Sequence, residues 1–281
     1  MQIDLAAWLQ HAQTRLAPVT DTPLLEAQWM AAETLQKTRT WVITHSDLAL
    51  SEPIQSQLEF LLTKRGQGNP LPYLFGHWEF YGFDFVVTPQ VLIPRPETEL
   101  MVELANHWIN THPGINRAVD VGTGSGCIPA SLAKLHPSLS LIAIDCSWVA
   151  LQVAKLNFQK LGTHNVSVLC GDLLTMAAGP FDLVCANLPY IPTPTLNDLP
   201  VSAFEPRLAL DGGEDGFDLI KSLLQDSQRW MAPGGCMLLE IESGQGESAP
   251  ALAASILPEA RVELHRDLAD RPRVVEIRWE G

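Results

Sequence analysis

The amino-acid sequence predicts an α/β protein with a doubly wound, mostly parallel sheet, preceded by a small helical domain and a linking β-hairpin. From about residue 96 onward, short apolar stretches of strand length alternate with stretches of helical periodicity. The residues before about 75 carry helical periodicity alone, and an aromatic, β-branched segment separates the two parts. We therefore expect a helical domain over residues 1–75, a hairpin linker over 76–95 and the sheet domain over 96–281.

The N-terminal part contains two helices with clear start signals. One is predicted over residues 23–37, where Pro23 suits the first turn, and another over 52–66, where Ser51 is the expected cap. The segment "HWEFYGFDFVVTP" that follows is rich in aromatic and β-branched residues around Gly82. This pattern predicts the hairpin.

In the sheet domain, the alternation of strands and helices indicates an open sheet that is covered on both faces. Ligands of such sheets bind at the carboxyl ends of the strands, so the loops that follow strands are the candidate site. The predicted strands cover residues 118–121, 139–145, 166–172, 181–187, 236–241 and 273–279, and the predicted helices cover 96–109, 127–135, 147–162, 216–231 and about 246–256.

The 281 residues are 46% hydrophobic and 18% charged, with a formal net charge of −14. This balance shows no basic surface of the kind that binds a nucleic-acid backbone, so no direct nucleic-acid partner is expected. No apolar run is long enough for a membrane span and the first residues lack a signal-peptide pattern, which makes the cytoplasm the expected location. Cysteines without C-x-x-C spacing and scattered histidines predict reduced, mostly buried thiols and no metal site.

The loop after the first predicted strand, in "AVDVGTGSGCIPASLA", is a candidate cofactor site. Its glycines Gly122, Gly124 and Gly126, with Thr123 and Ser125 between them, allow a tight turn and a close approach to a ligand. The dinucleotide fingerprint G-x-G-x-x-G fails because its last position is a cysteine. The G-x-G-x-G spacing fits S-adenosylmethionine better, and the alternative is a simple strand-to-helix turn.

Two acids end the following strands. Asp145 ends "LIAID", where a carboxylate can accept hydrogen bonds from both ribose hydroxyls of an adenosine-containing cofactor. Its alternative role is in capping the next helix, which Ser147 could also cap. Asp172 in "LCGDLL" could receive the exocyclic amine of adenine while Leu173 packs on the ring, or it could be a solvated acid at a strand end.

The fourth strand of the series ends in Asn187-Leu188-Pro189-Tyr190. The Asn187 side-chain oxygen and the Leu188 carbonyl could accept both N–H bonds of a planar NH2 group, so that its lone pair faces a methyl donor. Pro189 restricts Leu188 to an extended conformation, and Tyr190 could lay its ring on the flat group and favour developing positive charge. Alone, the segment could equally be an Asn-x-Pro turn.

The chain resembles the HemK/PrmC family of methyltransferases that modify glutamine in class-1 peptide chain release factors. The resemblance covers most of the sequence and is carried by "LIPRPETE", "DVGTGSGCI", "NLPYI", "FEPRLALDGGEDGFDLI" and "LLEIESGQGE". It implies a class I S-adenosylmethionine-dependent methyltransferase fold, S-adenosyl-L-methionine as cofactor and the glutamine of a Gly-Gly-Gln loop as acceptor. By position, the residues Gly122 to Gly126, Asp145, Asp172 and Leu173 would line the cofactor, and Asn187 to Tyr190 would hold the glutamine.

Three positions depart from the family pattern. Leu188 stands where the family usually has proline, which keeps the carbonyl but removes one rigid ring. Leu173 stands where an aromatic residue is often found, and Asp270 where glycine is common. The helical N-terminal domain would be the docking surface for the release factor.

Two further segments and three other functions are compatible with the sequence. The "IPRPETE" segment could border the methyl-donor pocket or simply start a helix. Glu205 and Arg207 in "FEPRLAL" could shape the substrate entrance or pair with each other, and pairing is the expectation. The alternative functions are a methyltransferase for adenine or guanine amines of RNA or DNA, a non-catalytic cofactor-binding module, and a nicotinamide dehydrogenase, which Cys127 disfavours.

Overall fold

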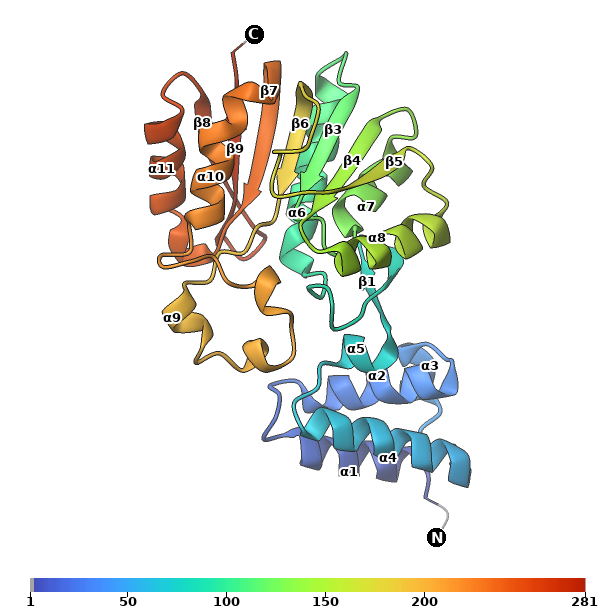
Figure 1. Ribbon diagram of the computed structural model, residues 1–281. Helices are drawn as coiled ribbons and strands as arrows, with labels where there is room; N and C mark the ends of the chain where they lie inside the picture. The colour runs from blue at the N-terminus through green and yellow to red at the C-terminus, as the bar shows by residue number, and fades with distance from the viewer. Residues whose placement is uncertain (1–2, 281) are drawn as a thin grey trace. The chain divides into compact units, whose positions relative to one another are not determined.

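The computed structural model describes residues 3–280, and the chain divides after Gly76 into two compact units (Figure 1). The first unit is helical and has a core of its own, which includes Trp8, Met30 and Leu58. The Glu26 carboxylate is almost fully buried there and accepts a hydrogen bond of 2.6 Å from Arg65 Nε. The helices of this unit are α1 (Leu5–Leu16), α2 (Pro23–Leu35), α3 (Arg39–Thr44), α4 (Glu52–Gly66) and α5 (Leu71–Phe75).

The second unit begins with the predicted hairpin, β1 (His77–Phe80) and β2 (Phe83–Val86). Tyr81 and Gly82 form its turn with φ values of 51° and 75°, the positive pair that a two-residue turn between twisted strands requires. The Tyr81 main-chain N–H also donates to Glu99 Oε1 at 2.8 Å, which ties the turn to the start of helix α6.

The main sheet has the strand order β5-β4-β3-β6-β7-β9-β8. Strands β3 to β7 run parallel, and β9 and β8 are antiparallel to their neighbours, so the mostly parallel sheet is confirmed. The strands are β3 (Arg117–Val121), β4 (Ser140–Asp145), β5 (Val166–Cys170), β6 (Phe181–Ala186), β7 (Met231–Glu240), β8 (Arg261–Arg266) and β9 (Pro272–Arg278).

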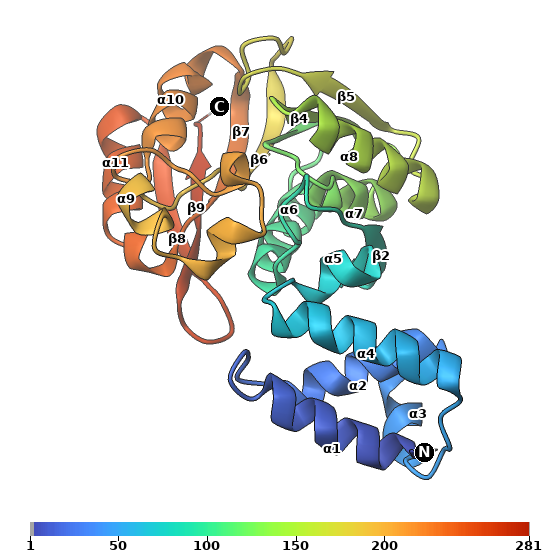
Figure 2. The same ribbon diagram turned by 60° about the horizontal axis from the view of Figure 1, so that its bottom comes forward.

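Helices cover both faces of this sheet, as Figures 1 and 2 show. One core cluster joins the sheet to α6, α7, α8 and the hairpin, and a second cluster joins its other face to α10 and α11. The helices are α6 (Glu99–Thr111), α7 (Cys127–Leu135), α8 (Trp148–Leu161), α9 (Thr193–Leu196), α10 (Asp218–Asp226) and α11 (Ser248–Ile256), with short 3-10 turns at Pro96–Thr98, Pro200–Ala203, Arg207–Ala209, Ser227–Arg229 and Ser243–Gln245.

The strand order creates one switch point, between β3 and β6. From β3 the chain moves outward to β4 and β5, and then returns to the other side of β3 as β6. The register pairs Val121 with Ala186, so the loops after these two strands leave the sheet side by side. A crevice at the carboxyl ends of strands at such a point is the usual ligand site of doubly wound sheets.

Most predicted elements are present near their predicted bounds, and α7 covers residues 127–135 as expected. The edge strand β8 was not predicted, because its sequence "RVELHR" mixes charged residues with only two aliphatic ones. No strand of the described chain pairs with its outer edge. Over the part of the chain that the structure describes, no helix has the length and apolar character needed to cross a membrane.

Candidate active site at the β3–β6 switch point

The glycine loop after β3 is a tight turn that the positive φ values of Gly122, Gly124 and Gly126 make possible. The main-chain N–H groups of Gly122 and Thr123 both donate to the Ile144 carbonyl at 2.9 Å, which fastens the loop to β4. A Cβ atom on Gly126 would lie 2.7 Å from the ring of Phe158 on α8. Gly126 is therefore needed for close packing between the loop and that helix, whereas the loop ahead of it can approach a ligand.

Asp145 lies at the end of β4, beside this loop. Its two carboxylate oxygens accept main-chain hydrogen bonds from Gly124 at 2.9 Å and Ser147 at 2.8 Å, which orient the group. Ser147 itself caps α8 by accepting a bond from the Ala150 N–H at 3.2 Å. Burial raises the pKa of Asp145 in spite of the two hydrogen bonds. Ser147 is therefore the residue that caps α8, and Asp145 is fixed next to the glycine loop.

A second acid, Asp120 on β3, is buried beneath the glycine loop and is only 1% exposed. Among the described residues, neither carboxylate oxygen forms a hydrogen bond of good geometry, and neither does the buried Thr123 hydroxyl, although Thr123 is close enough to lower the pKa of Asp120. Burial raises the pKa of Asp120 to about 7. Unpartnered buried polar atoms are costly, so this arrangement is typical of a site that is completed by a ligand.

Asp172 and Leu173 follow β5 on the far side of β4. The Asp172 side chain is exposed, and Leu173 is partly buried with a φ of 47°. Leu173 packs against the same core cluster as β3 and β6. Asp172 and Leu173 therefore lie at the carboxyl end of β5, next to the ends of β4 and β3.

The Asn187–Tyr190 segment leaves β6 directly against the glycine loop. A Cβ atom on Gly122 would lie 3.1 Å from Leu188 Cδ2 and 3.6 Å from the Asn187 carbonyl oxygen. The Leu188 side chain is only 4% exposed and belongs to the core on the α10 side of the sheet. Burial of this side chain holds the backbone at the position where the family pattern has a second proline ring.

A cavity of about 100 Å³ opens beside Asn187, Pro189 and Tyr190. This volume is well below the several hundred Å³ of pockets that enclose whole ligands, so the cavity suits a single side-chain group. Its other lining residues are Leu92, Arg95, Ile191, Val201, Ala209 and Leu210.

The loop 211–216 packs against the backbone of the Asn187–Tyr190 segment and of Ile191. No role was predicted for this loop from the sequence. The Gly212 N–H donates to the Ile191 carbonyl at 2.9 Å, and a Cβ on Gly212 would lie 2.7 Å from the Pro189 carbonyl oxygen. Gln245 Nε2 donates to the Tyr190 carbonyl at 3.4 Å. The cluster of glycines in "DGGEDG" was the available signal, because backbone that approaches other backbone closely needs residues without side chains.

The "IPRPETE" segment also contacts Asn187. Asn187 Nδ2 donates to the Thr98 hydroxyl at 3.2 Å, and Thr98 is 2% exposed. Glu240, at the end of β7, is 3% exposed, and burial raises its pKa to about 7 although Thr98 and Asn187 both act to lower it. Glu240 Oε2 has no hydrogen-bond partner among the residues described. Neither Thr98 nor Glu240 was identified as a site residue from the sequence.

The predicted pairing of Glu205 with Arg207 is wrong. Glu205 is buried, forms an ion pair with Arg95 and accepts the Ile93 N–H at 3.1 Å. Arg207 instead pairs with Asp211 at 2.9 Å. Tertiary contacts outweighed proximity in sequence, because a buried carboxylate needs a cation and a main-chain donor that reach its own pocket.

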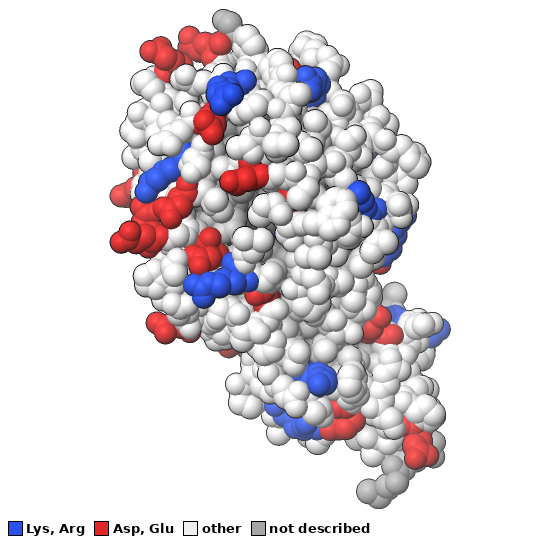
Figure 3. Space-filling view, in the orientation of Figure 1, with Lys and Arg blue, Asp and Glu red and all other residues white. Residues whose placement is uncertain are grey.

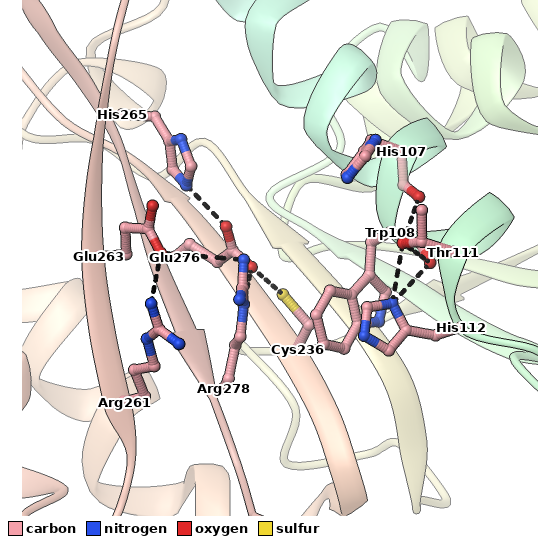
Figure 4. Close-up of polar contacts among 10 residues, drawn as sticks. All are labelled: His107, Trp108, Thr111, His112, Cys236, Arg261, Glu263, His265, Glu276 and Arg278. Carbon is pink, nitrogen blue, oxygen red and sulfur yellow. Dashed lines mark hydrogen bonds and ion pairs between the residues drawn. The ribbon is translucent and has the colours of Figure 1, made fainter.

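Another buried acid on the α6 side of the sheet, Glu276, belongs to a different kind of cluster (Figure 4). Glu276 on β9 accepts a hydrogen bond of 2.6 Å from His265 Nε2 and pairs with Arg278, whose guanidinium lies 5.3 Å from the centre of the Trp108 ring. Burial alone would raise the pKa of Glu276, but its hydrogen bonds with His265 and Arg278 lower it to about 2. In residues 3–280, no group of three His, Cys, Asp or Glu side chains is arranged to hold a metal ion.

The fold and the switch-point site together define a methyltransferase of the class I type. The chain superposes on a methyltransferase from Pyrococcus furiosus with a TM-score of 0.53 at 16% identity, covering 72% of this chain and 91% of that one. At this identity the likeness concerns the fold. The family model described as the methyltransferase small domain matches residues 98–197, which include the glycine loop and Asn187.

The particular family follows from the full-length sequence comparison. The model described as the PrmC N-terminal domain matches residues 7–76. The release factor glutamine methyltransferase of Moorella thermoacetica is 39% identical over 269 residues, covering 94% of this chain and 95% of that protein. The one from Nitratidesulfovibrio vulgaris is 36% identical over 279 residues, covering 96% and 94%. The chain belongs to the release factor glutamine methyltransferase family.

Proposed function

We propose that this protein transfers a methyl group from S-adenosyl-L-methionine to the side-chain amide nitrogen of the glutamine in the Gly-Gly-Gln loop of class-1 peptide chain release factors. Family membership over nearly the whole chain supports this function. The structural observation that carries it is the close approach of Gly122 to the Asn187 carbonyl oxygen and the Leu188 side chain. A cofactor on the glycine loop and an acceptor on the Asn187–Tyr190 segment would be immediate neighbours, as methyl transfer requires.

The residues around the glycine loop suit this cofactor. A carboxylate offers about four acceptor positions, so Asp145 can bind ribose hydroxyls while it keeps its main-chain hydrogen bonds. The unpartnered oxygens of Asp120 suit a ligand that brings positive charge and hydrogen-bond donors. When bound, the cofactor supplies an electrophilic methyl group on a positively charged sulfur.

The remaining cofactor contacts are assigned by position along the strand ends. Asp172 would accept a hydrogen bond from the adenine amine, and Leu173 would contact the adenine ring. The loop residues Gly122, Thr123, Gly124, Ser125 and Gly126 would line the cofactor, with Asn187 at the boundary between cofactor and acceptor.

For the acceptor, Asn187 and Leu188 would hold the two N–H bonds of the glutamine amide. Both groups are oxygen acceptors, and together they leave the nitrogen lone pair directed toward the methyl donor. Pro189 and the burial of Leu188 keep these acceptors in position, so little reorganisation is needed during the reaction. An amide nitrogen that has gained a methyl group loses a proton readily, so the residues need only orient it.

Tyr190 would lie on the flat amide group. Burial raises the pKa of its phenol to about 12, so the side chain stays neutral at physiological pH. A neutral aromatic ring stabilises positive charge that develops over its face. We therefore assign Tyr190 a stacking role and no role as a base.

The helical N-terminal unit would dock the release factor, and the reaction would take place in the cytoplasm. The nucleic-acid alternative gains no support from the charges. In Figure 3, Lys and Arg side chains on the visible face of the second unit form separate groups, several of them beside acidic ones. Enzymes that bind nucleic acid usually present a continuous basic surface near the site.

The test uses labelled S-adenosylmethionine and purified release factor. We expect label on the release factor, and none when the loop glutamine is changed to asparagine. Label that persists on the asparagine variant would overturn the assignment of the acceptor. Label that RNase or DNase removes from a cell extract would instead support the nucleic-acid alternative.

A further inference from the structure

The orientation of the Asn187 side chain decides whether it can serve as an acceptor. An asparagine amide presents an oxygen on one side and an NH2 group on the other, and the two ends have almost the same shape. If the amide were turned over, its NH2 group would face the N–H groups of the glutamine and repel them. A clamp built on Asn187 therefore needs neighbours that distinguish the two ends.

Those neighbours come from two other elements. The parallel register of β6 and β7 pairs Ala186 with Leu239, so the next residues, Asn187 and Glu240, leave the sheet beside each other. Thr98, at the start of α6, contacts the same amide, with Asn187 Nδ2 donating to Thr98 Oγ1 at 3.2 Å. Thr98 and Glu240 are 2% and 3% exposed, so water does not compete for these contacts.

We propose that Thr98 and Glu240 are positioning residues that hold the Asn187 amide with its nitrogen toward the protein interior and its oxygen toward the acceptor glutamine. This inference rests on the proposed role of Asn187 as an acceptor of the substrate amide. The Thr98 hydroxyl accepts from Nδ2 and can donate its own proton toward the Glu240 carboxyl. Once ionised, the Glu240 carboxylate can only accept hydrogen bonds, so it attracts the NH2 end of an amide and repels the carbonyl end, and both neighbours then favour the same orientation.

The contacts of Thr98 and Glu97 suggest that the "IPRPETE" segment helps to position Asn187. Glu97 and Arg273 both act on the Glu240 carboxyl, Glu97 raising its pKa and Arg273 lowering it. Glu240 Oε2 nevertheless has no hydrogen-bond partner in the described part of the chain. Glu240 can therefore accept a hydrogen bond from the Thr98 hydroxyl or the Asn187 NH2 group, and both of these side chains lower its pKa.

The test combines kinetics with a direct view of the amide. In protein labelled with ¹⁵N-asparagine, the side-chain NH2 resonances of Asn187 are assigned by their loss in Asn187→Ala. We expect Thr98→Val to shift these resonances and to lower kcat roughly tenfold, the effect of losing one hydrogen bond. The cofactor Kd and the KM for release factor should stay within about twofold of wild type. Thr98→Ser, which keeps the hydroxyl, should restore both the resonances and kcat.

Thr163→Val is the matched control. Thr163 is also a buried threonine, and its hydroxyl donates one hydrogen bond of 3.3 Å to the Phe158 carbonyl on α8, with no contact to Asn187, Thr98 or Glu240 among the described residues. It should leave the Asn187 resonances and kcat unchanged. If Thr98→Val does not fold, Glu240→Gln provides the same two readouts.

The outcomes separate this inference from the proposed function. Asn187 resonances and kcat that do not respond to Thr98→Val, in a wild-type background that methylates the release factor, would overturn the positioning role. Resonances that shift as expected in a protein that transfers no methyl group to glutamine would support the orientation and overturn the proposed function instead.

Discussion

Glu240 on β7 and Glu276 on β9 lie on the same face of the sheet and are both 3% exposed, yet their environments are opposite. Glu276 is paired with Arg278 and His265, and its pKa falls to about 2. One oxygen of Glu240 has no hydrogen-bond partner among residues 3–280, and burial raises the pKa of Glu240 to about 7. The charge of Glu276 is balanced by its two neighbours, whereas Glu240, beside Asn187, has an oxygen that can still accept a hydrogen bond.

The difference shows how a buried charge can be recognised as structural or functional. A buried carboxylate without full compensation lowers the stability of the folded state, so selection for stability alone would replace or pair it. Strongly raised pKa values of this kind are concentrated at functional sites. Asp120, beneath the glycine loop, shares the raised pKa and the unpartnered oxygens of Glu240.

The largest effect is expected at Asn187, the group that Glu240 is proposed to position. Asn187→Ala should lower kcat roughly a thousandfold, because a preorganised acceptor at the reacting group is lost. Calorimetry should show a cofactor Kd close to that of wild type, since Asp145 and the glycine loop remain. A collapse of cofactor binding would show that Asn187 serves the cofactor and not the acceptor amide.

The two carboxylates should also give opposite pH profiles of stability. The folded-state pKa of Glu240, about 7, lies above its ordinary value of 4.5, so its contribution to stability declines as the pH rises from about 4.5 to 7. That of Glu276, about 2, lies below 4.5, so its contribution is present above pH 4.5 and is lost as the pH falls toward 2. Each pKa shift changes the free energy of unfolding by about 3 kcal/mol across its pH range.

Urea unfolding across this pH range measures both contributions. Glu240→Gln should remove about 3 kcal/mol of the wild-type decline between about pH 4.5 and pH 7, and Glu276→Gln should flatten the loss at low pH. Asp120 titrates in the same window as Glu240 but is present in both proteins, so the comparison with wild type isolates Glu240. Identical pH profiles for wild type and Glu240→Gln would contradict the raised pKa.

At neutral pH, the same two variants should separate catalysis from stability. Glu240→Gln should lower kcat about tenfold and leave the free energy of unfolding unchanged or higher, because a poorly compensated charge is removed. Glu276→Gln should lower the free energy of unfolding by about 2 kcal/mol, since Arg278 and His265 lose their partner, and leave kcat within about twofold. An equal loss of kcat in both variants would show that Glu240 has no special role in catalysis compared with Glu276.

The smallest effect is expected at Glu263 on β8, an exposed carboxylate next to the Glu276 cluster. It lies 3.5 Å from Arg261 and 3.9 Å from Arg278, and its side chain is 42% exposed. Glu263→Gln should change the free energy of unfolding by less than about 0.5 kcal/mol, because water and salt screen such pairs. A larger change in urea unfolding would show that burial is not what distinguishes Glu276.

The placement of some segments of the candidate site could be predicted from the sequence because it depends on local chemistry. The glycine loop and Asp145 follow strands whose apolar patterns are evident, and Asn187 with Pro189 forms a segment whose geometry is set by the residues themselves. The partner of Glu205 could not be predicted, because Arg95 lies far away in sequence and only the folded chain brings the two together. The edge strand β8 was missed for a similar reason, since pairing with β9 outweighs its mixed composition.

The sequence by itself determined the doubly wound fold, the family and the segments that meet at the switch point, because these depend on periodicity and on short motifs. It could not distinguish Glu240 in "LLEI" from Glu276 in "VVEI", since each is an acid between aliphatic residues of a predicted strand. Only the tertiary structure decided that Arg278 and His265 neutralise one acid, while Thr98 and Asn187 stand beside the other. The energy of a buried charge depends on which groups surround it in space, and strand register and helix placement determine those groups.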